Sequence, residues 1–196
     1  YINGGGMNLE WFQKNFAPGQ GFDQLNRAAA EIPPGSEGLI FIPHLEGRGY
    51  PSNPSLRGQW SGFTRDHTPA HFYRSVLEGT AYEYALYKES IQERLGERDL
   101  RYDTRAVAGG AKSPVWNKIK ADVLESPYCT INREDIALLG QALIAAAAAG
   151  RIGNIAGHVK GIVTVREVTR PDPENHRLYR ECVDRYRRTL SLFEHQ

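Results

Sequence analysis

The sequence predicts an α/β domain in which helices flank a layer of short strands. Residues 38–43 form a brief apolar run between glycine and proline, which is typical of a buried strand. From residue 105 onward, strand-like runs alternate with helical patterns, as expected for a layered α/β fold. The chain has 196 residues, of which 40% are hydrophobic and 24% charged, so it can bury a core without metal or disulfide staples.

The first part of the chain is expected to contain helices and two strands. Helical patterns cover 7–16 and 22–31, and they end at the helix-breaking residues 18–19 and 33–35. A loop over 44–57, rich in Gly, Pro, Ser and Asn, separates the strand at 38–43 from a second strand at 58–63. We therefore divide the chain into 1–37, a linker with an N-terminal helical segment, and 38–196, the main domain.

A long helix follows the second strand. It is expected to begin at Thr68-Pro69, an N-cap followed by proline in the first turn, and to end at Gly96. Alternating spacings of four and three predict a core-facing stripe of Tyr73, Leu77, Thr80, Tyr84, Tyr87 and Ile91. Glu78 lies beside this stripe, and a buried glutamate must be paired or hydrogen-bonded. We interpret Glu78 as part of a structural polar network, with an interface as the alternative.

The second half of the chain alternates strands and helices. A strand at 105–108 leads through Gly109-Gly110 into a helix over 114–124, and a strand at 128–131 leads into a helix over 136–149. A last strand at 161–165 precedes a terminal helix from about residue 173. The expected apolar line of that helix is Leu178, Cys182, Tyr186 and Leu190.

Charge and cysteine content exclude several classes of protein. The 24 Lys+Arg and 23 Asp+Glu residues leave a formal charge of +1, so no strong field attracts nucleic acid or a membrane surface. Cys129 and Cys182 are too few for a disulfide framework and indicate a reducing, cytoplasmic compartment. The longest apolar run, 136–149, is too short to span a bilayer. The chain begins at Tyr1 without an initiator methionine, and we expect it to be part of something larger.

The local feature that most suggests a ligand site is the segment 106–116, in which two glycines lie between the end of a strand and the start of a helix. Glycines at such a turn let a ligand lie against the backbone without a Cβ in the way, as many nucleotide sites require. A Gly-Gly pair is, however, more often an ordinary turn between two elements that binds no ligand. The segment is neither a P-loop nor a dinucleotide fingerprint, because the required glycine and Lys-Ser/Thr spacings are missing.

Other candidate sites have structural interpretations. His67 and His71 are four residues apart, but no glutamate follows the first histidine, so we interpret both as cap and surface residues rather than zinc ligands. No spacing places two of Asp66, Glu46, Glu78 and Asp122 together as paired acids. No serine occupies a nucleophile elbow, and Cys129 is expected to be a small core residue. The arginines of the last helix alternate with acidic residues, which indicates a solvated helix face rather than a nucleic-acid-binding patch.

A collinear set of short segments extends from about Trp11 to about Gly150. The segments are 38–45, 57–58, 62–64, 66–68, 77–81, 108–116, 121–124 and 137–142. Only Gly109-Gly110-Ala111-Lys112-Ser113 is specific by itself, but together the segments resemble the C-terminal domain of the FGGY carbohydrate kinases, closest to the xylulokinase-like members.

The resemblance implies an actin-like, ribonuclease-H-like domain with a mixed sheet flanked by helices, one of two domains that close over a cleft. It implies that ATP and Mg²⁺ serve to phosphorylate a sugar hydroxyl, with a xylulose-like pentulose as the expected substrate. The ATP-binding residues it implies are Gly109, Gly110, Ala111, Lys112 and Ser113. The general-base aspartate and early phosphate loops belong to the N-terminal kinase domain, which this chain lacks. We therefore assign it no catalytic residue and no metal ligand, and expect no phosphoryl transfer by the chain alone.

One segment departs from the family pattern. Xylulokinase-like sequences usually carry Gly-Glu-Arg-x-Pro, where this chain has Gly47-Arg48-Gly49-Tyr50-Pro51. The resemblance places this segment near the interdomain cleft, so another pentulose or polyol stays an alternative substrate. A non-catalytic actin-like regulatory or assembly module is the alternative function, and a homodimer is an alternative to the single chain.

Overall fold

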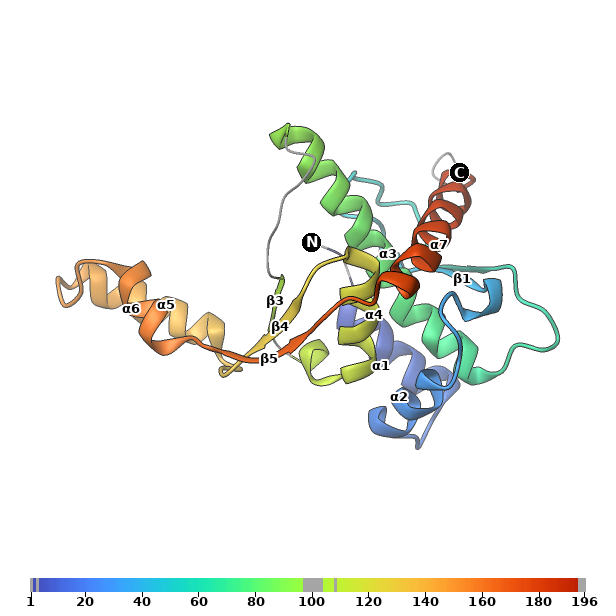
Figure 1. Cartoon of the computed structure of the whole chain (residues 1–196), viewed down its shortest axis with the longest axis horizontal. Coiled ribbons are helices and arrows are strands. Elements are labelled where there is room, and N and C mark those ends of the chain that lie inside the picture. Colours follow the sequence, from blue (N-terminus) through green and yellow to red (C-terminus); the bar gives the residue numbers. More distant parts are fainter. Residues whose placement is uncertain (1, 3, 97–103, 108, 194–196) are drawn as a thin grey trace.

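Helix α3 (Pro69–Leu95) is the longest element of the computed structural model and crosses the middle of the molecule (Figure 1). The structure describes residues 2, 4–96, 104–107 and 109–193. The predicted helix ends are confirmed, because Thr68 caps the start and Gly96, with a φ of 66°, ends α3. Tyr73, Leu77 and Thr80 are buried as expected, and Tyr84 and Tyr87 are half-buried. Ile91 is 53% exposed, contrary to prediction, because the last turns of α3 extend beyond the helices packed against it (Figure 1).

The core forms where four other helices pack around α3. These are α1 (Gly5–Phe16), α2 (Phe22–Ala30), α4 (Pro114–Leu124) and α7 (Pro173–Ser191). Leu9 and Phe12 of α1 and Leu25 of α2 belong to the same buried cluster as α3. Residues on both sides of position 38 therefore share one core, and the division of the chain into 1–37 and 38–196 stays a prediction.

A two-stranded antiparallel sheet packs against α3. It consists of β1 (Ile40–Ile42), which follows the short 3-10 helix η1 (Ser36–Gly38), and β2 (Gln59–Ser61), with Phe41 opposite Trp60. Both strands were predicted in longer form. The approach of β1 to the helix requires glycine at position 79, because a Cβ there would lie 2.2 Å from the carbonyl oxygen of Phe41.

A second, mixed sheet has the order β3–β4–β5. Strand β4 (Tyr128–Ile131) pairs in parallel with β3 (Thr104–Ala106) and antiparallel with β5 (Val165–Thr169). The strand predicted at 105–108 is thus confirmed over Arg105 and Ala106. Val107 lies after the end of β3, and Ala108 lies outside the described residues. Cys129 is buried in β4, as expected for a small core residue. Helix α4 covers this sheet, and the 3-10 helix η2 (Gly109–Lys112) connects β3 to α4.

The strand predicted at 161–165 is wrong. Gly161 and Ile162 end a helix that was not predicted, α6 (Ile155–Ile162), and β5 begins only at Val165. The N-cap signal is Asn154, whose side chain accepts a hydrogen bond from the Gly157 amide. The β-branched residues after Gly161 favour a strand, and this is why the helix was not predicted. Strand β5 is almost fully exposed, so its sequence shows no pattern of a buried strand.

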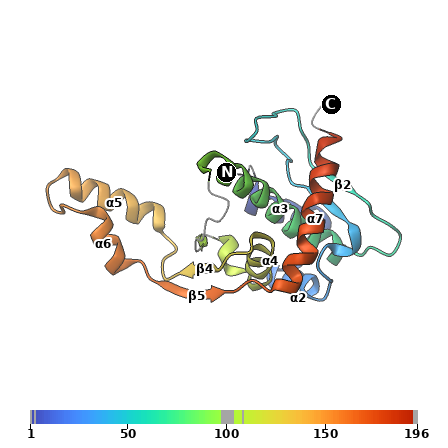
Figure 2. The ribbon, with the colours of Figure 1, turned by 45° about the horizontal axis from the view of Figure 1, so that its top comes forward.

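Helices α5 (Ile136–Ala148) and α6 form an arm that projects from the body (Figures 1 and 2). The predicted helix at 136–149 is confirmed. Although α5 is almost entirely apolar, only Leu143 is buried, and Leu138 and Ile144 are 65% and 63% exposed. Within the described residues, no helix combines the length and apolarity needed to cross a membrane.

Helix α7 confirms the predicted terminal helix but not its full apolar line. Cys182, Tyr186 and Leu190 are buried, whereas Leu178 is 47% exposed. Steps of four residues rotate by about 40° each around a helix, so a strict four-residue line leaves the buried face. Tyr179 occupies that face instead of Leu178.

Candidate functional site

The glycine turn predicted as a ligand site connects β3 to α4. Residues Gly109–Lys112 form η2, and Ser113 is the N-cap of α4, where its Oγ accepts a hydrogen bond from the Trp116 amide at 3.3 Å. The two glycines differ in their surroundings. A Cβ on Gly109 would meet no atom within 4 Å, whereas one on Gly110 would lie 2.8 Å from the Trp116 ring. Gly109 therefore leaves its backbone accessible, and Gly110 is required for packing.

All five predicted residues, Gly109 to Ser113, line one cavity of about 670 Å³. Its aromatic lining residues include Tyr84, Trp116 and Tyr128. The Trp116 ring is fixed by a hydrogen bond from its Nε1 to the Leu77 carbonyl oxygen at 2.9 Å. The size is typical of a small-molecule site, and accessible backbone beside a partly apolar lining suits a nucleoside.

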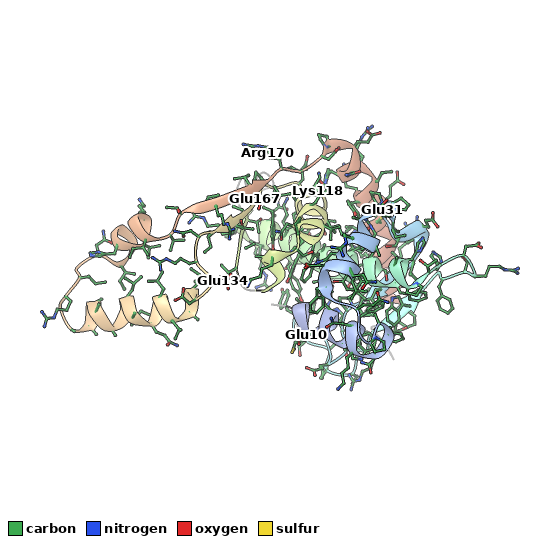
Figure 3. All side chains as sticks on the ribbon, turned by 90° about the horizontal axis from the view of Figure 1, so that it is seen from below. Glu10, Glu31, Lys118, Glu134, Glu167 and Arg170 are labelled. Atoms are coloured by element: carbon green, nitrogen blue, oxygen red, sulfur yellow. The ribbon has the colours of Figure 1, made fainter. Side chains whose placement is uncertain are left out.

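The opposite wall of the cavity comes from α1 and α2, and the sequence did not predict it. Glu10 of α1 and Asp23 and Asn26 of α2 line it, together with Gly6, around which a Cβ would find open space. Figure 3 labels Glu10 on α1. The run of glycines at 4–6 is the signal that could have pointed to this wall.

A second, smaller cavity borders the other side of the turn. Its volume is about 340 Å³, and charged side chains of Arg133, Glu134, Arg166 and Glu167 line it. Lys112 faces this side, because its Nζ lies 3.0 Å from Glu134 Oε2 near the start of α5, where Figure 3 labels Glu134. Of the two cavities, only the larger one is lined by the full turn and by aromatic side chains.

Glu78 lies in a structural network, as the sequence predicted. It is 1% exposed, and its carboxylate accepts hydrogen bonds from Arg74 Nε, the Gly35 amide, Ser36 Oγ and Tyr179 OH at 2.7–2.9 Å. A buried carboxylate with four donors is fully satisfied and fixes the relative positions of α3, α7 and the 35–36 segment.

The other polar candidates also have structural roles. The His71 ring accepts a hydrogen bond from the Thr68 amide at the start of α3, and His67 accepts one from the Thr64 amide. The cap interpretation is confirmed, but His71 is buried rather than at the surface. Asp122 accepts hydrogen bonds from the Asp172 amide and Lys118 Nζ, in a network separate from that of Glu78. Across the described parts of the chain, no group of three metal-binding side chains gathers.

The segment that departs from the family pattern is anchored to the protein by one buried side chain. Arg48 is 6% exposed, and its Nε donates to Glu83 Oε1 at 2.7 Å. Glu83 also accepts a hydrogen bond from Tyr186 OH at 2.8 Å, and His44 Nε2 lies 3.5 Å from its Oε1. The arginine at position 48 therefore fastens the loop to α3 and α7.

Comparisons with known proteins find similar sequences over most of the chain. The family model of the FGGY family of carbohydrate kinases, C-terminal domain, matches residues 3–149. A xylulose kinase of Staphylococcus epidermidis is 32% identical over 182 residues, covering 92% of this chain and 36% of that protein. A gluconokinase of Bacillus subtilis is 30% identical over 162 residues, covering 77% of this chain and 31% of that protein. The chain thus spans only about a third of the length of these curated relatives.

A solved structure shows the same fold. The xylulose kinase of Lactobacillus acidophilus superimposes with a TM-score of 0.85 at 21% sequence identity, over 97% of this chain and 38% of that one. The predicted fold class, an actin-like α/β domain with a mixed sheet flanked by helices, is confirmed.

Proposed function

The chain belongs to the FGGY family of carbohydrate kinases, and from this membership we propose that it is the C-terminal, ATP-binding part of a kinase that phosphorylates a sugar hydroxyl. The observation that carries the proposal is the 670 Å³ cavity, because the whole Gly109–Ser113 segment lines it. Gly109 offers open backbone there, and the apolar part of the cavity lining suits a nucleoside.

A xylulose-like pentulose is the substrate we propose, in line with the names of several relatives, and a sugar acid is the alternative that the gluconokinase relative suggests. ATP supplies the phosphoryl group when bound, and Mg²⁺ is proposed to accompany it, with no residue of this chain assigned to the metal. The N-terminal domain of the kinase is the proposed partner, and the cytoplasm the proposed location.

In such a kinase, this chain contributes binding and orientation rather than proton transfer. The turn and the N-terminus of α4 hold the nucleotide in one position, and catalysis of phosphoryl transfer depends mainly on such positioning. We accordingly propose that the chain alone binds ATP and does not turn it over. Sugar-dependent ATP hydrolysis or phosphoryl transfer by the purified chain would contradict this.

The nucleotide site is tested by calorimetric titration of ATP into three proteins. Gly109→Val places a side chain in open space at the cavity and is expected to weaken ATP binding at least tenfold while the protein stays folded. Gly153→Val is the matched control, because a Cβ there also meets no atom within 4 Å but lies outside the residues that line the cavity. Hydrogen exchange should show that ATP protects residues 109–116.

Two outcomes refute the proposal. Equal ATP affinity of the Gly109→Val and Gly153→Val variants would exclude the turn as the binding site. No saturable ATP response of the unmodified chain would favour the alternative of an actin-like regulatory or assembly module.

A further inference from the structure

Lys120 is a buried cation at the proposed nucleotide cavity. It lies on α4, is only 3% exposed, and lines the same cavity as Gly109, Gly110 and Ser113. Among the residues that the structure describes, none forms an ion pair or a hydrogen bond with its ammonium group. Glu10 and Asp23 also line this cavity, but neither forms an ion pair with Lys120.

Two aromatic rings are the neighbours that compensate the charge in part. The Lys120 Nζ lies 4.0 Å from the centroid of the Trp116 ring and 4.6 Å from that of Tyr128. Contacts with ring faces stabilise an ammonium group less than a carboxylate or phosphate does, and burial penalises a charge without such a partner. This burial lowers the pKa of Lys120 to about 7.

Polar side chains that are buried this deeply normally have a hydrogen-bond partner, and the Lys120 ammonium has none among the described residues. Its position in the cavity, rather than in the packed core between α3 and α4, means that a ligand can supply that partner. We propose that the Lys120 ammonium binds the phosphate oxygens of the nucleotide whose nucleoside lies against the Gly109–Ser113 turn. The inference rests on the proposed function, and it adds a residue outside the predicted motif.

The proposal implies that nucleotide affinity depends on pH. A phosphate beside Lys120 favours its charged form, so binding takes up a proton near neutral pH, and affinity falls as the pH rises and the free amine loses its charge. Other titratable groups line the cavity: Glu10, Asp23, Lys112, Tyr73, Tyr84 and Tyr128. Phosphate has its second pKa near 6, so the ligand keeps its full charge across the pH range of the test.

The experiment compares ATP with adenosine, which has the same nucleoside and no phosphate. Dissociation constants are measured by calorimetry at pH 7 and pH 9 for the unmodified chain, Lys120→Met and Lys118→Met. Methionine keeps the length and removes the charge. Lys118 is the matched control on the same helix, because it is 42% exposed and its Nζ forms an ion pair with Asp122 at 2.6 Å.

We expect Lys120→Met to weaken ATP binding about tenfold or more at pH 7 and to leave adenosine binding within twofold. The unmodified chain and Lys118→Met should lose about tenfold in ATP affinity between pH 7 and pH 9, and Lys120→Met should lose far less. Thermal unfolding without ligand should show Lys120→Met at least as stable as the unmodified chain, because it removes a buried charge. Lys120→Gln serves as a second neutral variant if Lys120→Met does not fold.

The possible failures are distinguishable. If the unmodified chain binds both ligands and Lys120→Met retains its ATP affinity, the role of Lys120 is refuted and the nucleotide site stands. If Lys120→Met weakens adenosine and ATP equally, Lys120 shapes the cavity and does not bind phosphate, which also refutes the inference. If the unmodified chain binds neither ligand, the proposed function and the inference both fail.

Discussion

Replacing Glu78 with glutamine tests whether the buried network in α3 determines the stability of the fold. The substitution keeps the size of the side chain and one acceptor oxygen, and it removes the negative charge. Arg74, which is 6% exposed, then loses the partner that lies 2.8 Å from its Nε. The Ala29 carbonyl oxygen and Tyr179 OH remain within hydrogen-bond distance of its other nitrogens, but neither carries a charge.

The expected loss is large because the remaining charge is buried. Breaking a buried ion pair from one side costs about 3–5 kcal/mol, a substantial share of the 5–15 kcal/mol by which domains are usually stable. For a chain of this size, each kcal/mol lowers the melting temperature by about 2–4 °C, so Glu78→Gln should lower it by about 6–20 °C. Arg74→Met in the same chain removes the uncompensated cation and should restore part of the loss.

The assay is urea unfolding followed by circular dichroism, applied to both single variants and the double variant. A favourable coupling of about 2 kcal/mol or more between the two positions is expected. Glu89→Gln on the same helix is the control, because Glu89 forms an ion pair with Arg187 at 2.6 Å in which both side chains are about half exposed. This substitution should lower the free energy of unfolding by less than about 1 kcal/mol. Equal losses for Glu78→Gln and Glu89→Gln, or strict additivity of the pair, would refute the reasoning.

Three further predictions concern other parts of the chain. Gly79→Ala should destabilise the protein in urea unfolding, although alanine favours helices, because its Cβ would lie 2.2 Å from the carbonyl oxygen of Phe41 in β1. Gly140→Ala on α5 is the control and should stabilise the protein by up to about 1 kcal/mol, because a Cβ there meets no atom within 4 Å. If both substitutions stabilised the protein, the close contact at Gly79 would be contradicted. Backbone amides lower the pKa of the N-cap Asp172, so its stabilisation of α7 is present above about pH 4 and lost as the pH falls further. Asp172→Ala should therefore lower the melting temperature at pH 7 and have little effect near pH 2, and a constant difference would be inconsistent with this assignment. Leu138→Gln with Ile144→Gln should reduce the fluorescence of a hydrophobic dye that binds at α5, and unchanged fluorescence would contradict the exposure of these two side chains.

Local signals explain which elements the sequence predicted well. Thr68-Pro69 and Gly96 define α3 by capping chemistry that acts within one turn, so its boundaries did not depend on distant contacts. Strand β5 is the opposite case, since four of its five residues are exposed and it forms by pairing with β4. A pattern search for buried strands misses such a strand and selects the neighbouring apolar run instead.

The candidate site was predictable on one side only. The Gly109–Ser113 turn is a local motif, but its opposite wall comes from α1 and α2, about 100 residues earlier in the chain. Lys120 lies in a helix with an ordinary amphipathic sequence, and only the packed structure shows that its ammonium is buried without a carboxylate. The burial of charge depends on tertiary packing, so sequence spacing could not reveal it.

The two tyrosines of α7 affect how the chain must fold. Tyr179 and Tyr186 donate hydrogen bonds to Glu78 and Glu83, about 100 residues upstream, and they lie outside the part matched by the family model. During synthesis, α3 emerges well before its last hydrogen-bond donors exist, and contacts of such high sequence separation form late. A nascent chain that ends near residue 150 therefore holds two carboxylates without their tyrosine partners, and the final helix completes the core of the protein.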